Sequence, residues 1–133
     1  TGDAQLTISQ NAPLTGAVIV TTPQAVSLAD ARKGMMMFQN VKVPLLGVVE
    51  NMSGSVFGHG GGSRLAEEFR VPYLGSLPLD PQVVETGDAG MPLVAEHPGS
   101  PVALEFQRIS GKVIEQLAAQ RETGFKPLSL EWR

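Results

Sequence analysis

GAVIVT at residues 16–21 is a short, continuous apolar run rich in β-branched residues. Two similar runs follow it, PLLGVV at residues 44–49 and the weaker YLGSL at residues 73–77. None of the three alternates polar with apolar side chains, and this pattern is typical of strands that are buried on both faces of a parallel sheet. The three runs therefore predict neighbouring parallel strands inside an α/β protein.

Helical patterns separate these predicted strands. Apolar side chains recur at steps of three and four over residues 28–38, and a shorter stripe covers residues 63–69. The longest stripe spans residues 102–117, and residues 4–10 have the composition of a short helix before the first strand. The alternation of strands and helices predicts βαβ crossovers, and hence a parallel sheet with flanking helices.

Proline follows a residue with a side-chain oxygen at three points: after Thr22, after Asp80 and after Ser100. An oxygen-bearing N-cap residue with proline at the first helical position favours a helix start, because proline lacks an N–H that has no helical partner there. We expect each of the three residues to cap a helix. Two of these helices would begin directly after strands, so their N-termini would face the same crevice.

The composition limits the classes of protein to which this chain can belong. Its 133 residues suit one domain, and 42% apolar with 17% charged residues is typical of a globular protein. With a net charge of −3, the chain lacks the basic character that nucleic-acid binders use. The absence of cysteine excludes disulfides and any thiolate metal site built from this chain alone. With no long apolar run or signal segment, we expect a cytoplasmic protein without membrane partners.

Asn51 is the most informative candidate for ligand binding. Ligands of open α/β sheets bind beyond the carboxyl ends of the strands, and residues 50–53 are expected to form the loop after the second strand. The side-chain amide of Asn51 can donate and accept hydrogen bonds together, which suits the edge of a purine base. The alternative is an asparagine that satisfies the backbone of its own turn.

The glycine-rich segment at residues 58–62 precedes a predicted helix at Ser63. Glycines allow backbone N–H groups to approach a phosphate closely, but no lysine follows them as it does in a Walker P-loop. A flexible turn into the helix is the other interpretation. His59 and His97 have no partner at metal-ligand spacing and are expected in loops, and the three methionines at residues 35–37 are expected to pack in the core.

An ordered series of motifs resembles the Mrp/ApbC-like P-loop ATPases, which belong to the deviant-Walker group. The resemblance covers about residues 1–120. Residues 121–126 have the character of a linker, and residues 127–133 form either an edge strand or the start of another module. The motifs are TGDAQLT at 1–7, VTTPQ at 20–24, DARKG at 30–34, VENMS at 49–53, FGHGG at 57–61, LPLDP at 77–81 and GDAGMP at 87–92.

The resemblance implies the C-terminal half of a P-loop NTPase domain that binds ATP and Mg²⁺. It implies that Asn51 holds the adenine, that Pro78, Leu79 and Asp80 line the base pocket, and that Gly2 and Asp3 belong to the switch that senses the γ-phosphate. The family's P-loop and its Walker-type aspartate would precede Thr1, so this chain supplies no catalytic or metal-binding residue and should not hydrolyse ATP alone.

The resemblance also implies a function, because the family comprises iron–sulfur cluster carriers that act as ATP-hydrolysing homodimers and serve apo acceptor proteins. Many members carry a C-x-x-C motif where this chain has SGSV at residues 53–56. Two functions therefore stay open: a cluster carrier, and a nucleotide-gated interaction or partition-type module that binds no cluster. A third possibility is a fragment with no activity of its own.

Overall fold

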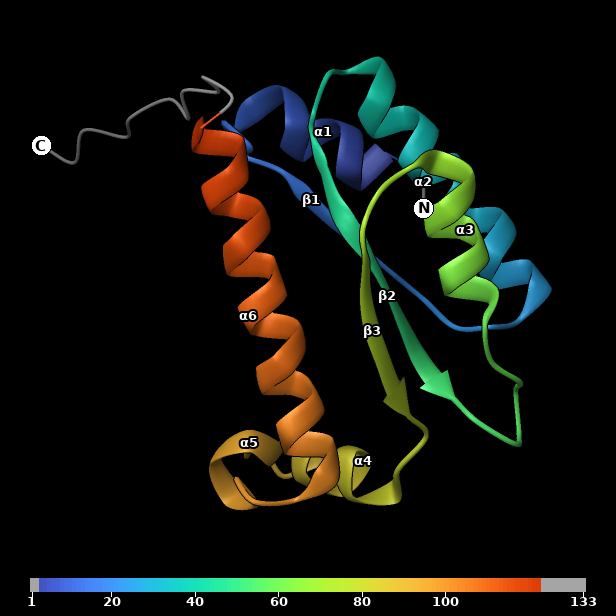
Figure 1. Ribbon diagram of the computed structural model, residues 1–133, viewed down its shortest axis with the longest axis vertical. Coiled ribbons are helices and arrows are strands. Elements are labelled where there is room, and N and C mark those ends of the chain that lie inside the picture. The colour runs from blue at the N-terminus through green and yellow to red at the C-terminus, as the bar shows by residue number, and fades with distance from the viewer. Residues whose placement is uncertain (1–2, 123–133) are drawn as a thin grey trace, which may run out of the picture.

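A computed structural model describes residues 3–122 as a three-stranded parallel sheet flanked by helices (Figure 1). Strands β1 (Ala17–Thr21), β2 (Leu45–Ser53) and β3 (Tyr73–Pro78) are adjacent in that order. The prediction of neighbouring parallel strands is confirmed. In the central strand β2, residues 46–50 are all buried, which explains why its sequence does not alternate.

Helices precede, connect and follow the strands. They are α1 (Asp3–Asn11), α2 (Ala25–Asn40) between β1 and β2, α3 (Gly61–Phe69) between β2 and β3, and then α4 (Pro81–Asp88), α5 (Leu93–Glu96) and α6 (Pro101–Glu122). The short helix α5 was not predicted. The first two residues of the predicted linker belong to α6, and the rest of that linker and residues 127–133 lie outside the described residues. Within residues 3–122, no helix combines the length and the apolar character needed to cross a membrane.

The two faces of the sheet are covered by different helices, with α2 and α3 on one face and α6 on the other (Figure 1). Because successive side chains of a strand point to opposite faces, Ile19 and Val48 join the cluster under α2 and α3. Their neighbours Val18 and Val49 belong to the cluster under α6. Helices of the βαβ-type connections therefore cover one side of the sheet, and α6 covers the other side over β2 and β3, whereas Val20 of β1 is 60% exposed.

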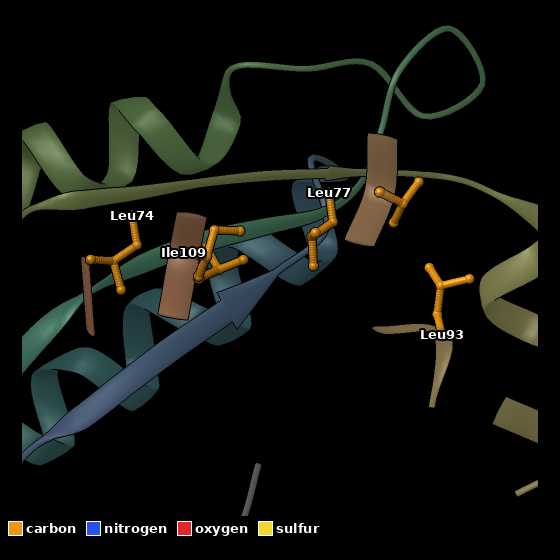
Figure 2. Close-up of a cluster of buried hydrophobic side chains, with 6 residues drawn as sticks. Leu74, Leu77, Leu93 and Ile109 are labelled. Carbon is orange, nitrogen blue, oxygen red and sulfur yellow. The ribbon is translucent and has the colours of Figure 1, made fainter. Parts of the chain in front are cut away.

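The cluster under α6 fixes this helix on β3. Figure 2 shows Leu74 and Leu77 of β3 with Ile109 of α6, and with Leu93, which α5 contributes. Gly75 lies between the two leucines at φ 141°, and a Cβ atom there would lie 2.9 Å from Cγ1 of Ile109. Glycine thus permits the close approach of helix and strand at this point.

Two of the three predicted helix caps are confirmed. The backbone N–H of Gln82 donates to Oδ1 of Asp80 at 2.8 Å, and α4 begins with proline at its first position. At the start of α6, the N–H of Ala103 donates to Oγ of Ser100 at 3.2 Å. Both side chains satisfy N–H groups that the first helical turn leaves without partners.

The prediction that Thr22 caps a helix is wrong. Helix α2 begins at Ala25, and its N-cap is Gln24, which makes no side-chain capping bond. Gln24 has φ −68° and ψ 144°, so the extended backbone continues past the proline and moves the helix start two residues further. The hydroxyl of Thr22 instead lies 2.7 Å from Oγ of Ser27 in the first turn of α2.

Candidate functional site

The carboxyl ends of the three parallel strands lie at the same edge of the sheet, as expected for a ligand-binding crevice. The prediction of a loop at residues 50–53 is wrong, because β2 continues through these residues. Backbone pairing explains the extension, because Glu50 pairs with Ser76 of β3 and Ser53 pairs with Pro78. The candidate residue Asn51 therefore lies on the sheet rather than in a loop.

The end of β2 contains an irregularity around Asn51. The step from Glu50 to Ser53 spans three residues of β2, whereas the paired step from Ser76 to Pro78 spans two residues of β3. An opposite shift between Val48 and Val49 compensates this step, so the irregularity is a local bulge within residues 49–53, and such bulges re-aim the side chains beside them. Met52 takes up the distortion with φ 56°, a left-handed conformation that is uncommon outside glycine.

Asn51 lines an open cleft of about 470 Å³ beside β1. The cleft is also lined by Thr21 and Thr22 at the end of β1, by α2 residues that include Asp30, and by Gln5 of α1. Among the described residues, the side-chain amide of Asn51 has no hydrogen-bond partner. The alternative, in which the side chain of Asn51 binds the backbone of its own turn, is therefore not observed among the described residues.

Two threonine hydroxyls line the same cleft at the end of β1. Thr21 is buried, and its Oγ1 donates to the carbonyl oxygen of Thr22 at 2.9 Å. Oγ1 of Thr22 lies within hydrogen-bonding distance of both Ser27, as described above, and Oε1 of Gln24, at 3.2 Å. These bonds fix polar groups that line the cleft at the end of β1, and they join this end to the start of α2.

The predicted base-pocket residues Pro78, Leu79 and Asp80 lie beside the end of β2 but do not line this cleft. The N–H of Leu79 donates to the carbonyl oxygen of Ser53 at 3.3 Å, so the segment reaches the bulge through backbone contact. Pro78 is exposed and Leu79 is 40% exposed, whereas the carboxylate of Asp80 is engaged as the cap of α4.

One of the two residues predicted to sense the γ-phosphate lies at the start of α1. Asp3 is the first residue of this helix and is exposed, whereas Gly2 lies outside the described residues. Gln5, two residues after Asp3, lines the cleft that contains Asn51. The structure thus brings α1 to the cleft, although through Gln5 and not through Asp3.

Glu50 is a buried charged residue next to Asn51, with only 1% of its surface exposed. Its carboxylate accepts hydrogen bonds from Oγ of Ser53 at 2.6 Å, from the N–H of Gly62 at 2.8 Å and from the N–H of Gly60 at 3.2 Å. Burial raises the pKa of Glu50, but these three hydrogen bonds and the charge of nearby His59 outweigh it and lower the pKa overall.

The glycine-rich segment is positioned around this carboxylate. Helix α3 begins at Gly61, two residues earlier than predicted, after Gly60 in a left-handed conformation with φ 89°. A Cβ atom on Gly62 would lie 3.0 Å from Cβ of Glu50. The N–H groups at this helix start thus bind a carboxylate of the chain itself, which favours the turn into the helix over a phosphate cradle.

The remaining candidates are the three methionines at residues 35–37 and the two histidines. Met35 is fully buried, as predicted, although Met36 is 53% exposed. His59 is exposed in the loop before α3, and His97 lies at the C-cap of α5. In residues 3–122, no group of three histidine, aspartate or glutamate side chains is arranged to hold a metal ion.

Sequence reasoning missed Glu50 and Gln5. The sequence did contain a signal for Glu50, since a carboxylate at the end of a buried apolar run needs compensating donors. The glycine run ten residues later supplies these donors. Gln5 carries no comparable signal, because its place at the cleft depends on how α1 packs.

Comparisons with known proteins agree with this architecture. Residues 1–114 match the model of the ParA family described as NUBPL iron-transfer P-loop NTPase. The iron-sulfur cluster carrier protein of Aquifex aeolicus is 44% identical over 131 residues, which cover 91% of this chain and 36% of that protein. The iron-sulfur cluster transfer protein NUBPL of Dictyostelium discoideum is 45% identical over 127 residues, covering 88% of this chain and 39% of that protein.

Solved structures share the fold. The septum site-determining protein MinD of Pyrococcus horikoshii, complexed with Mg-ADP, superposes with a TM-score of 0.69 at 26% identity, covering 80% of this chain and 44% of that one. A nucleotide-binding protein of Archaeoglobus fulgidus in complex with ADP has a TM-score of 0.62 at 34% identity, covering 79% and 46%.

The chain spans between about a third and a half of the length of these relatives and structures. Three observations within that span support the same family. They are the parallel sheet, the order of the motifs and the identity of nearly half of the aligned residues. The resemblance to Mrp/ApbC-like P-loop ATPases is thus confirmed, and the chain belongs to the family of NUBPL-type iron-transfer P-loop NTPases.

Proposed function

We propose that this chain forms the base-binding side of an ATP site in an iron–sulfur cluster carrier. The observation that carries the proposal is the side-chain amide of Asn51, which lines the 470 Å³ cleft without a hydrogen-bond partner among the described residues. An amide in this position offers a donor and an acceptor, which is the combination presented by the N6 and N1 atoms of adenine. Two relatives of known structure hold ADP, which supports a nucleotide as the ligand.

Carboxylates of the chain itself already occupy the N-termini of two helices at this edge of the sheet. The N-terminus of α3 already binds the carboxylate of Glu50, and that of α4 is capped by Asp80. We therefore assign the phosphate cradle and the Mg²⁺ ligands to sequence outside this chain, as the greater length of the relatives supports. On this proposal, the chain alone does not hydrolyse ATP, and the cofactors ATP and Mg²⁺ are bound by the longer protein.

The other predicted site residues keep their roles as proposals. Pro78 and Leu79 present exposed apolar surface beside the end of β2, where a base could stack, and Asp80 holds this segment through the start of α4. Gly2 and Asp3 would sense the γ-phosphate, and Asp3 would do so from the first position of α1. Gln5 on the same helix lines the cleft, which supports a place for α1 beside the nucleotide.

The cluster is the cargo in this proposal rather than a resident cofactor. The names of the relatives, a cluster carrier and a cluster transfer protein, support delivery of a cluster, and we propose that a homodimer delivers it to apo acceptor proteins. This chain has no cysteine, so thiolate ligands would have to come from sequence outside it or from a partner. The same absence favours the second candidate function, a nucleotide-gated module of the MinD type that binds no cluster.

The nucleotide site is tested by titrating ATP into the full-length protein that contains this sequence. We expect Asn51→Ala to weaken ATP binding about tenfold, the equivalent of about one or two hydrogen bonds. Asn40→Ala is the matched control, because Asn40 is exposed at the end of α2 and away from the cleft. Equal affinity of the Asn51 variant and the wild type would remove Asn51 from the base pocket.

The cargo is tested separately by anaerobic reconstitution of the full-length protein with iron and sulfide. A carrier should develop visible cluster absorption and activate an apo iron–sulfur acceptor, and transfer should depend on the integrity of the nucleotide site. A protein that binds ATP normally but shows neither absorption nor transfer would favour the nucleotide-gated module. The two measurements thus separate the nucleotide site from the cluster.

A further inference from the structure

The bulge that contains Asn51 is closed by a side-chain bridge. The carboxylate of Glu50 and the hydroxyl of Ser53 are joined by a 2.6 Å hydrogen bond that spans Asn51 and Met52. These are the residues over which the register between β2 and β3 shifts. The bridge therefore holds together the two ends of the distorted segment, and Asn51 lies inside it.

The same carboxylate fixes the bulge to a second element. Its bonds to the N–H groups of Gly60 and Gly62 connect the end of β2 to the first turn of α3. A buried carboxylate with three donors is held more firmly than a surface carboxylate, because each bond lost would leave a desolvated group unpaired. Glu50 is thus a rigid anchor one residue away from Asn51.

We infer that Glu50 is a positioning residue for base recognition, which rests on the proposed ATP site. Its carboxylate locks the bulge in the conformation that directs Asn51 to the cleft beside β1. A regular strand would not hold Met52 at φ 56° next to Asn51, and relaxing this distortion would change the direction of the Asn51 side chain. Glu50 touches no ligand in this scheme and acts through Asn51.

The test compares the affinities for ATP and purine riboside 5′-triphosphate in the full-length protein. The two nucleotides have the same sugar and phosphates, but the analogue carries hydrogen in place of the 6-amino group, so it cannot donate to the amide oxygen of Asn51. We expect the wild type to prefer ATP about tenfold, which corresponds to about 1.4 kcal/mol. Glu50→Gln should lose most of this preference.

A double-mutant cycle shows whether Glu50 acts through Asn51. In an Asn51→Ala background, Glu50→Gln should cause no further loss of the ATP preference, because the group that it positions is gone. Glu67→Gln on α3 removes a charge at an exposed position and is the matched control, which should keep the full preference. A Glu50→Gln protein that retains the preference while Asn51→Ala loses it would overturn the positioning role alone.

A wild type that does not distinguish ATP from purine riboside 5′-triphosphate would overturn the proposed base site together with this inference, so the two failures give different results. If Glu50→Gln does not fold, Ser53→Ala is the second variant. It removes the bridge across the bulge and leaves the charge and both glycine bonds in place. We expect it to reduce the ATP preference severalfold, and an unchanged ratio in a folded Ser53→Ala protein would contradict the inference.

Discussion

The carboxylate of Glu50 accepts a 2.8 Å hydrogen bond from the backbone N–H of Gly62, so a buried charge of β2 lies at the first turn of α3. The positive end of the helix dipole and two N–H groups stabilise this charge. The contact joins the central strand to the helix that follows it, and it lies one residue from Asn51. Stability and ligand geometry are thus coupled at one side chain.

We expect Glu50→Gln to lower the free energy of unfolding by about 1–3 kcal/mol at neutral pH, because its amide NH₂ would face N–H or O–H donors in a buried site. The pKa of Glu50 is lowered in the folded protein, so its ionised form adds stability above the unfolded pKa of about 4.3. This contribution is lost as the pH falls through the lower folded pKa.

Thermal unfolding followed by circular dichroism between pH 3 and pH 8 checks this linkage. The difference in Tm between wild type and Glu50→Gln should be constant above about pH 6 and shrink below about pH 5. The exposed Glu67→Gln control should show little difference at any pH. A gap between wild type and Glu50→Gln that stays constant down to pH 3 would show that the charge of Glu50 does not stabilise the fold.

Gly62→Ala should destabilise the protein by about 1–3 kcal/mol, because the added Cβ would lie 3.0 Å from Cβ of an immobilised Glu50. Gly111→Ala in α6 is the opposite case, since nothing lies within 4 Å of its added Cβ. Alanine within a helix should stabilise the protein there by about 0.5–1 kcal/mol. Urea denaturation of the two variants measures both changes, and a stabilising Gly62→Ala would contradict the tight contact.

Met52 should respond to substitution in a way that depends on backbone conformation more than on side-chain size. Its φ of 56° is costly for β-branched residues, so Met52→Val should lose about 1–3 kcal/mol. Met52→Gly should be less damaging than Met52→Val, because glycine adopts this conformation freely. Unfolding midpoints in urea rank the two variants, and a glycine variant less stable than the valine variant would refute the strain.

Asp80→Ala should cost about 1 kcal/mol by removing the cap of α4, whereas Asp80→Asn should be close to neutral because asparagine caps equally well. Equilibrium denaturation of both variants decides this. If Asp80→Asn were as unstable as Asp80→Ala, the negative charge would matter more than the hydrogen bond to Gln82.

Much of the fold could be predicted from local patterns. The three apolar runs gave the strands, and the side-chain oxygens of Asp80 and Ser100 gave two helix starts. Thr22 has the same local pattern and failed, because the chain stays extended through Gln24 before α2 begins. A cap motif indicates which residues are favourable at a helix start, but the path of the chain after the strand decides where the helix begins.

The candidate site was only partly predictable. Asn51 was identified from its place after an apolar run, yet its position on a bulge of β2 depends on pairing with β3. The glycine segment was open to two interpretations until its N–H groups were found to bind Glu50. Both results depend on groups that are distant in the sequence or on another strand, which no local pattern contains.

The sequence by itself determined the class of fold, the order of its strands and helices, and the family, because periodicity and ordered motifs are local properties of the chain. Only the tertiary structure decided which donors satisfy the Glu50 carboxylate, and that Asn51 and Thr22 line one cleft while Asp80 caps a helix instead. The physical reason is that a buried charge and a strand register are settled by partners brought together only when the chain folds.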